Sequence, residues 1–568
     1  MCYYESMKKN SINKLFIVVS FCVVFVVSAI ISGLNLFFTV NTASMEYSLE
    51  NMVSHIEKLS SKKHSVFEQN NLEEMRQYIV DNLNSYGVAN ELVKHETTYL
   101  YNGAIDIVEE CDIKNIYAEI PGSSGVNILL MAHFDSCPYK VKYGQVTKDS
   151  RGAFDDGYGV ATLLEIARVY AGKTNLVNGI KFAFFDAEEV GMLGSEALFT
   201  HNRDWLNDVN IVINVEGRGN TGPVYMFETS KNNSKLIDFY KNAGFPFSFS
   251  MAADVYRMLP SNTDLSIFIE NDFNSLNLAT LDGLKYYHTQ DDNFNNIDKN
   301  SLASYCNTLL PLMEEYTLSD AYSSMNAFDS DHDSVFFTIL PNVLISYSPV
   351  VATILLIVSI LLVVGTIVMY IIKKQVSIVK LIISFVIDIL TIGLVFGLGM
   401  GAILLLCAMF GLEFNFMFVV RVPFDKVMLV VFLVVTFGIT LLVSLLKSKL
   451  NITSSEKMLS ILFINLVLLI ACTIVVMGAT FLFVIPILLL GVGALINLYN
   501  TSKIANIVYT VSTAVLAVVE MVLLALVVYS IFVAMSFGSL GMLLVLAVVP
   551  LLSINPYMLH LKFVEKEQ

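Results

Sequence analysis

Five short segments of the chain carry histidine or carboxylate side chains of the types that bind metal ions and activate water. These residues are His133 with Asp135, then Asp155, Glu188 with Glu189, Glu216, and His288. Imidazole nitrogens and carboxylate oxygens, with no cysteine among them, are the ligands of hydrolytic zinc centres that hold two ions about 3.5–4 Å apart. The residue types therefore indicate metal-assisted hydrolysis with two zinc ions per chain.

His133 and Asp135 follow the apolar run 127–132, which predicts a buried strand. Residues two apart on a strand face the same way, so the imidazole can bind a metal while the carboxylate fixes its tautomer. By itself a His-x-Asp pair is more often a surface turn. The pair therefore gains meaning only together with the other segments.

Asp155 lies in the glycine-rich segment 152–159, at the start of a helical pattern over 157–171. Glycines let the backbone come close to a site, and a carboxylate placed before a helix can bridge two cations. The alternative is an ordinary helix N-cap, a position that aspartate favours.

Glu188 and Glu189 follow the apolar run 180–186. Two adjacent carboxylates at a strand end repel each other and are costly to desolvate unless a cation or a shared proton compensates. One glutamate is thus expected to bind metal while the other takes a proton from metal-bound water. A solvated loop is the alternative.

Glu216 and His288 also come after apolar runs, at 210–215 and 276–280, and helical patterns such as 301–316 alternate with these runs. This alternation predicts an α/β domain with a mainly parallel central sheet flanked by helices. In such folds the ligand site lies at the carboxyl ends of the strands, where all five segments are expected.

Motifs of other enzyme classes are either absent from the sequence or followed by residues that do not fit the motif's structure. Gly217 to Gly222 matches GxGxxG, but Pro223 and β-type residues follow in place of a helix, so we interpret it as a loop. The sequence contains no HExxH, GxSxG or Walker loop. The remaining histidines are interpreted as surface or core residues, and these are His55, His64, His95, His201, His332 and His560.

As an ordered set, the segments resemble the aminopeptidase-Y-type family of co-catalytic di-zinc metallopeptidases (clan MH). The stretch Leu259 to Leu265, with the later Tyr-His288-Thr, further resembles the membrane branch of that family, the vacuolar and endoplasmic-reticulum metallopeptidases. The resemblance covers roughly residues 50–320, and the membrane part matches only in layout.

The resemblance implies a role for each site residue. Asp155 would bridge both zinc ions, His133 and Glu216 would complete one site, Glu189 and His288 would complete the other, Glu188 would be the general base, and Asp135 would orient His133. Two positions depart from the pattern. Asp156 stands where many relatives have Asn, and Glu216 where secreted aminopeptidases have Asp, although glutamate is usual in the membrane branch.

The resemblance implies a zinc-dependent metallopeptidase, of the aminopeptidase or exopeptidase type, that hydrolyses peptide substrates. One alternative is acyl transfer of the glutaminyl-cyclase type, which uses a similar ligand set around a single zinc. Another is a peptide-binding homologue without activity. Because every ligand position is filled, the enzyme is favoured, and an assay of amine release against loss of water would separate peptidase from cyclase.

Composition divides the chain into a soluble part and a membrane part. With 55% hydrophobic and 15% charged residues, the 568-residue chain is too apolar to be wholly soluble, so the lipid bilayer is an expected partner. We predict a cytoplasmic tail and signal-anchor helix over 1–41, with a cleaved signal peptide as the alternative, and an extracytoplasmic peptidase domain over 42–335. An all-α multi-pass domain of about seven transmembrane helices follows over 336–568. Its apolar runs lie near 347–372, 380–410, 424–446, 457–477, 479–499, 504–530 and 535–556.

Lysines flank these runs in alternate loops. They are Lys8, Lys9, Lys373, Lys374, Lys380, Lys447, Lys449, Lys457, Lys503, Lys562 and Lys566. By the positive-inside rule all of them are cytoplasmic, so the peptidase domain lies on the opposite face. We expect a bacterial plasma membrane with the domain outside; a vacuolar or endoplasmic-reticulum membrane with a lumenal domain is the alternative.

Charge and cysteine content exclude other classes of partner. The net charge of −15, without clusters of Lys and Arg in the soluble part, excludes nucleic acid. Seven cysteines without CxxC spacing indicate neither a disulfide framework nor a thiolate zinc site, and no feature predicts an oligomeric state. Asp388 and Glu520 lie inside predicted spans, where ionisable groups mark a polar path or an interhelical pair, although simple anchoring is the default role of the helices.

Overall fold

The computed structural model describes two compact units of the chain. The described residues are 23, 26–36, 40, 46–102, 107–138, 140–142, 145–147, 150–259, 261–411, 414, 424–499 and 503–560. One unit comprises residues 35–348, and the other comprises residues 1–34 with 349–568.

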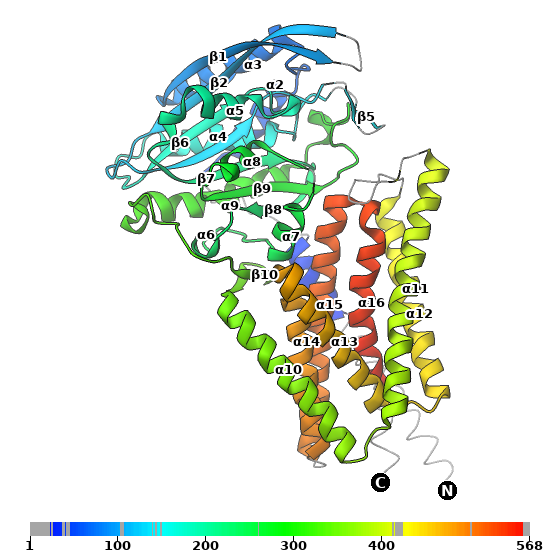
Figure 1. The fold of residues 1–568 in the computed structure, drawn as a ribbon. Helices are drawn as coiled ribbons and strands as arrows, with labels where there is room; N and C mark the ends of the chain where they lie inside the picture. The colour runs from blue at the N-terminus through cyan, green and yellow to red at the C-terminus, as the bar shows by residue number, and fades with distance from the viewer. Residues whose placement is uncertain are drawn as a thin grey trace. The chain divides into compact units, whose positions relative to one another are not determined.

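Seven strands of the first unit form one mixed sheet in the order β1-β2-β6-β3-β7-β9-β8 (Figure 1). The strands are β1 (Ala89–Asn102), β2 (Ile107–Ile120), β3 (Asn127–His133), β6 (Gly179–Phe185), β7 (Val209–Gly217), β8 (Thr221–Thr229) and β9 (Ser275–Asp282). The four central strands β6, β3, β7 and β9 are parallel, whereas β1, β2 and β8 pair antiparallel at the two edges. The predicted α/β fold with a mainly parallel centre is confirmed.

Helices cover both faces of this sheet because side chains alternate between the faces along each strand. Ile128 and Leu130 of β3 pack in one cluster with residues of α2, α3, α4 and α9. Leu129 and Met131 belong to a second cluster with residues of α5 and α8. The bounds are α2 (Leu49–Leu59), α3 (Gln69–Tyr86), α4 (Gly157–Tyr170), α5 (Leu193–His201), α8 (Asp264–Glu270) and α9 (Lys299–Leu318). Burial on two faces explains why β3 and β6 are nearly continuous apolar runs.

Smaller elements complete the first unit. They are the hairpin β4 (Lys140–Lys142) and β5 (Gln145–Thr147), the helices α6 (Ser234–Tyr240) and α7 (Ser250–Tyr256), and the hairpin β10 (Val335–Leu340) and β11 (Val343–Tyr347). The last hairpin groups with the sheet, and the helical unit resumes only at Pro349, where an apolar helix begins. The predicted boundary at 335/336 therefore falls at the start of this hairpin rather than after it.

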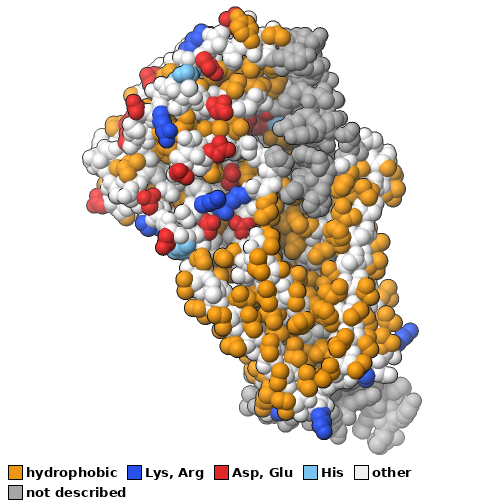
Figure 2. Space-filling model, viewed as in Figure 1, with side chains coloured by type: hydrophobic (Ala, Val, Ile, Leu, Met, Phe, Trp, Pro, Cys, Tyr) orange, Lys and Arg blue, Asp and Glu red, His pale blue; other side chains and the backbone are white. Residues whose placement is uncertain are grey.

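Apolar helices make up the second unit. They are α10 (Pro349–Ile372), α11 (Ile378–Phe410), α12 (Asp425–Lys449), α13 (Ser454–Val475), α14 (Phe481–Tyr499), α15 (Lys503–Met535) and α16 (Leu540–His560). Within the described residues, five helices are long and apolar enough to cross a membrane, and three shorter apolar helices lie at Val26–Leu36, Phe481–Ile496 and Phe537–Ser553. Hydrophobic side chains dominate the surface of these helices (Figure 2).

A helix is present in each of the seven predicted C-terminal runs, whereas most of the predicted signal anchor lies outside the described residues. Its described part includes the helix Val26–Leu36, and residues 26–34 of this helix belong to the helical unit, where the Ser28 hydroxyl donates to the Val518 carbonyl over 3.5 Å. The number of crossings and their orientation stay predictions.

Asp388 forms an interhelical ion pair, which is one of the two roles expected for an ionisable residue in a span. Its Oδ1 lies 2.5 Å from Lys447 Nζ on α12, and its Oδ2 accepts a hydrogen bond of 2.6 Å from Ser460 on α13. Asp388 and Lys447 are both buried. The carboxylate is thus compensated by a cation and a hydroxyl from two neighbouring helices.

Candidate metal centre

The carboxyl ends of the central strands position one group of ligand atoms around His133. This residue is the last of β3, and Glu216 lies near the end of the adjacent β7. His133 Nε2 lies 3.3 Å from Asp155 Oδ1 and 3.4 Å from Glu216 Oε1. All three side chains are buried, so these polar atoms face one another rather than solvent.

A second group of ligand atoms converges on His288. Its Nε2 lies 3.2 Å from Asp155 Oδ2 and 3.1 Å from Glu189 Oε1. The two oxygens of Asp155 therefore each face a different imidazole. The structure brings together all five residues that were predicted as metal ligands, in the pairing that the resemblance implied.

The donor set fits two zinc ions. Each position is surrounded by one imidazole, one glutamate and one oxygen of a shared aspartate, and this leaves room for water in a tetrahedral site. Burial, reinforced by the charge of Glu189, raises the pKa of Asp155, and burial together with Glu216 raises that of Asp156 well above the usual range. Divalent cations can compensate the charge of these buried carboxylates and favour their ionised form.

The pKa values of the two histidines are also raised, but here burial opposes the shift and the neighbouring negative groups cause it. Burial lowers the pKa of His133, but the carboxylates of Glu216, Asp135 and Asp155 outweigh it and hold the value well above the ordinary one. For His288, burial is likewise outweighed by Cys137, Glu189 and Asp155. Both imidazoles therefore lie in a strongly negative environment, which also attracts metal cations.

Asp135 holds two parts of the site at once. His133 Nδ1 lies 3.0 Å from the Asp135 carbonyl oxygen and 3.4 Å from its Oδ1, so the remaining ring nitrogen, Nε2, is the one left for a metal. The carboxylate of Asp135 also accepts hydrogen bonds from the backbone N–H groups of Glu188 (3.0 Å) and Glu189 (3.3 Å). The expected orienting role thus extends from His133 to the turn that carries both glutamates.

Glu188 opens a short 3-10 turn, Glu188–Val190, after the end of β6. Its side chain is half-buried, and burial together with the nearby Glu216 and Glu189 raises its pKa well above the usual range, although His133 acts in the opposite direction. A carboxyl group with a raised pKa can accept a proton and later release it, which is the property of a general acid–base residue.

Asp156 fulfils the alternative that was considered for this segment, because it is the N-cap of α4. Its Oδ1 accepts a hydrogen bond of 3.0 Å from Gly159 N, and its Oδ2 accepts one of 3.3 Å from His133 N. It also lies close enough to His133 and Glu216 to share a cation with them. The two adjacent aspartates therefore have different contacts: Asp155 faces the imidazoles, whereas Asp156 caps the helix.

His288 adopts a left-handed backbone conformation with φ of 53°. Such a conformation is costly for a residue other than glycine and is frequent at functional sites. Its ring stacks on Tyr287 with 3.7 Å between the centroids, and the Arg218 guanidinium lies 5.9 Å from the Tyr287 centroid. Stacking of this kind fixes the imidazole in place.

Cys137 brings a thiol close to the candidate ligands, where the sequence indicated no thiolate zinc site. Its sulfur belongs to a group with Glu189 and His288 whose ligand atoms all lie within 4.8 Å of one another. The sequence did contain a signal, because Cys137 stands two residues after Asp135, beyond the end of the ligand-bearing strand. Its lack of CxxC spacing concealed that signal, since the other ligands come from distant segments.

Behind Glu216 lies a buried chain of hydrogen bonds that the sequence did not predict. Asn214 Nδ2 donates to Glu216 Oε2 (3.4 Å) and to Asn277 Oδ1 (3.0 Å), and Asn277 Nδ2 donates to Glu228 Oε2 (2.9 Å). These side chains lie on the neighbouring strands β7, β9 and β8. The chain fixes the orientation of Glu216 through Oε2, while Oε1 faces His133.

Two further buried aspartates support the loops of the site. Asp186 pairs with the buried Arg76 at 2.5 Å and accepts from Lys114 N, which anchors the end of β6 before Glu188. Asp292 accepts from the Ser150 hydroxyl (2.7 Å) and from Phe154 N (2.9 Å). It thereby joins the segment that carries Asp155 to the segment that carries His288.

Gly217, the last residue of β7, needs to be glycine. A Cβ at this position would lie 1.6 Å from the carbonyl oxygen of Phe154, which directly precedes Asp155. The segment that matched GxGxxG is not a dinucleotide loop, since it joins β7 to β8. Its first glycine instead allows β7 to approach the loop that carries Asp155.

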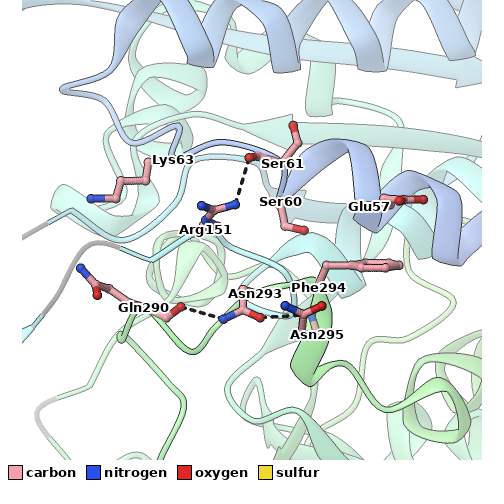
Figure 3. Close-up of a pocket in the computed structure, with 9 residues that line it drawn as sticks. All are labelled: Glu57, Ser60, Ser61, Lys63, Arg151, Gln290, Asn293, Phe294 and Asn295. Atoms are coloured by element: carbon pink, nitrogen blue, oxygen red, sulfur yellow. Dashed lines mark hydrogen bonds between the residues drawn. The ribbon is translucent and has the colours of Figure 1, made fainter.

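A cavity of about 640 Å³ is lined by residues from the segments 57–63 and 290–295 and by Arg151 (Figure 3). Arg151 and Gln290 line it from the loops of Asp155 and His288. The backbone N–H of Arg151 donates a hydrogen bond to the Asp292 carbonyl oxygen (3.2 Å). Lys63 and Glu57 also line the cavity, and the Arg151 guanidinium donates to the Ser61 carbonyl (3.1 Å). The volume lies in the range of ordinary ligand pockets.

Comparison with known proteins identifies relatives of this domain. The model of Peptidase family M28 matches residues 115–313, the range that holds the five predicted metal ligands together with Asp135 and Glu188. The chain is 29% identical over 207 residues to the vacuolar membrane protease of Candida dubliniensis, covering 36% of this chain and 21% of that protein. It is 28% identical over 254 residues to endoplasmic reticulum metallopeptidase 1 of Rattus norvegicus, covering 43% and 27%. The matched region thus spans about a quarter of the length of these relatives.

Solved structures are similar over about half of the chain. The glutaminyl cyclase of Porphyromonas gingivalis is 22% identical with a TM-score of 0.39, covering 48% of this chain and 99% of that one. A zinc aminopeptidase from Bacillus subtilis is 13% identical with a TM-score of 0.38, covering 50% and 99%.

Replacing Gly217 by alanine is expected to damage the metal centre without disrupting the sheet. The added methyl group must displace the Phe154 carbonyl and with it Asp155, and misplacement by about 1 Å can cost about 100-fold in rate. The metal content and the hydrolytic rate of the purified Gly217→Ala protein would show the damage. Gly172→Ala is the matched control, because no atom lies within 4 Å of its added Cβ. Equal metal content and activity in both variants would show that the contact has no role.

Glu228→Gln is expected to remove part of the pH dependence of stability. Burial raises the pKa of Glu228 to about 7, against an unperturbed value of 4.5, so the folded chain keeps the proton while the unfolded chain loses it. Stability therefore falls as the pH rises from about 4.5 to 7, by up to about 3 kcal/mol. The glutamine still accepts from Asn277, so the variant should melt at a higher temperature than the wild type at pH 8. The difference in melting temperature between the variant and the wild type should narrow toward pH 5. An equal difference at both pH values would contradict this account.

Proposed function

Residues 115–313 place the chain in peptidase family M28, distantly homologous to vacuolar membrane proteases and endoplasmic reticulum metallopeptidase 1, and from this premise we infer a membrane-anchored zinc metallopeptidase. We propose that it acts as an aminopeptidase, on the non-cytoplasmic side of its membrane. The observation that carries the proposal is the position of Asp155, whose two oxygens face His133 and His288 separately.

The protein side chains have distinct tasks in the proposed reaction. Zinc ions held by His133, Asp155, Glu189, Glu216 and His288 would lower the pKa of a water molecule and polarise the peptide carbonyl. Glu188 takes the proton from the attacking water and delivers it to the nitrogen of the leaving amine. Asp135 holds the Glu188 backbone N–H, so the general base stays aligned with His133 during both transfers.

Asp264 is proposed to bind the free amino group of the substrate. It is buried, its Oδ1 accepts from the Ser195 hydroxyl at 2.7 Å, and its Oδ2 has no hydrogen-bond partner among the described residues. Burial raises its pKa to about 7, and His133, Asp135 and Glu216 lie near enough to influence it. A carboxylate close to the metals that is not needed as a ligand can pair with a substrate ammonium, which selects peptides with a free amino terminus.

We assign the substrate residues that follow the scissile bond to the cavity between segment 57–63 and the loops that follow Ser150 and His288. Lys63 and Arg151 give its walls positive charge, and Glu57 partly balances it.

We place the domain outside the cytoplasm, at a plasma membrane or in the lumen of a vacuole or the endoplasmic reticulum, on the basis of the lysine pattern.

Glu188→Gln is expected to abolish turnover while both zinc ions stay bound, because the amide cannot accept the proton. Loss of a general base typically costs about 100-fold to 10,000-fold in kcat. Zinc content per chain and kcat on an unblocked peptide, measured on the same preparation, test the assignment. Asp155→Ala is the matched comparison, since it should lose metal as well as activity. Retained activity in Glu188→Gln, or two zinc ions in Asp155→Ala, would contradict the assigned roles.

Asp264→Asn is expected to weaken selection for the substrate amino group. With the carboxylate lost, kcat/KM for a peptide with a free amino terminus should fall by about 10-fold or more, an energy of about 1.4 kcal/mol that is typical of a charged hydrogen bond. The amino-acetylated form of the same peptide should be a poor substrate of both proteins. If the wild type cleaves both peptides equally, the enzyme is not an aminopeptidase. If it releases water rather than an amine from a glutamine-initiated peptide, it is a cyclase.

A further inference from the structure

Glu520 is a second ionisable residue in the apolar helical unit, and its surroundings differ from those of Asp388. It lies on α15, within the stretch Ala514–Met535 that is long and apolar enough to cross a membrane. The residue is 4% exposed, and neither carboxylate oxygen has a hydrogen-bond partner among the described residues. An ionised carboxylate without a partner in such a medium costs several kcal/mol, so Glu520 either holds a proton or pairs with a cation.

A small cavity adjoins this carboxylate. It measures about 30 Å³ and is lined by residues of α13, α14, α15 and α16, which pack against one another (Figure 1). A volume of about 10–15 Å³ is enough for one water molecule, so the cavity can hold one small ion, with at most a water beside it. Apart from Glu520, none of the residues that line it carries an ionisable side chain.

The other walls of the cavity supply oxygen atoms. Asn465 of α13 is buried, and its amide nitrogen donates to Ile461 of its own helix at 3.0 Å, which leaves the amide oxygen for a ligand. Pro486 of α14 and Pro550 of α16 also line the cavity. Proline has no N–H, so the carbonyls four residues earlier lose their usual helical donor. Those carbonyls belong to Leu482 and Leu546, and both residues line the same cavity.

We propose that this cavity is a binding site for a single Na⁺ ion, held by the Glu520 carboxylate, the Asn465 amide oxygen and the backbone carbonyls of Leu482 and Leu546. Oxygen donors of this kind select hard cations. One carboxylate balances one positive charge, whereas a divalent ion would leave net charge in an apolar medium. Interrupted helices that present backbone carbonyls beside an acidic side chain are a known means of coordinating Na⁺ within membranes.

Direct binding to the purified full-length chain in detergent is the primary test, because it does not depend on peptidase activity. Wild-type protein should bind radioactive ²²Na⁺ saturably, with displacement by unlabelled Na⁺ and little displacement by K⁺ or choline. Glu520→Gln should abolish this binding, and Asn465→Leu should weaken it about 10-fold or more. Absence of saturable ²²Na⁺ binding by the wild type would overturn the proposal, as would unchanged binding by Glu520→Gln.

Thermal stability provides a second measurement. Replacing choline chloride by NaCl at equal ionic strength should raise the melting temperature of the wild type by about 2–4 °C, measured as monodisperse protein left after heating. Asp388→Asn is the matched control, since it removes a buried carboxylate outside the cavity and should keep the Na⁺ response. If acidification stabilises the wild type without Na⁺ and added Na⁺ then has no effect at any pH, Glu520 holds a proton instead and the proposal is wrong.

Discussion

Mutual repulsion among buried carboxylates is the constraint on which the peptidase domain depends. Asp155, Asp156, Glu189 and Glu216 crowd the carboxyl edge of a sheet whose two faces are both covered by apolar side chains. Such a cluster is stable only when positive charge compensates it, and the two imidazoles cannot balance every carboxylate. The domain is therefore built so that folding prepares a strongly negative cavity and cations complete it.

The rigidity of this cavity comes from contacts around the ligands rather than from the ligands themselves. Asp135 joins His133 to the Glu188 turn, Asp292 joins the two loops that carry Asp155 and His288, and the Asn214–Asn277–Glu228 chain supports Glu216. Each of these contacts connects segments that are far apart in sequence. Preorganisation of this kind matters because a hydrolytic centre loses much of its rate when a ligand moves by about 1 Å.

Sequence reasoning located the strand ends well because it relied on local signals. An apolar run followed by His133, Glu188 or Glu216 is visible in a few residues, and the sheet then brings those ends together. Cys137 and Asn277 escaped prediction because their roles depend on which strands become neighbours, and no periodic pattern encodes that. The hairpin of β10 and β11 was not predicted, because its two short strands pair with each other and their pairing depends on the folded chain.

The two acidic residues of the helical unit show how the same energetic problem can have different solutions. Asp388 receives a lysine and a serine from neighbouring helices, so its charge is satisfied inside the protein and its role is explained by packing. Glu520 lies beside a cavity bordered by two prolines, and each proline frees a backbone carbonyl that an unbroken helix would have used. Mere anchoring in lipid requires neither the carboxylate nor the prolines, and both carry an energetic cost. Their occurrence around one cavity is therefore better explained by a ligand than by the needs of a membrane anchor.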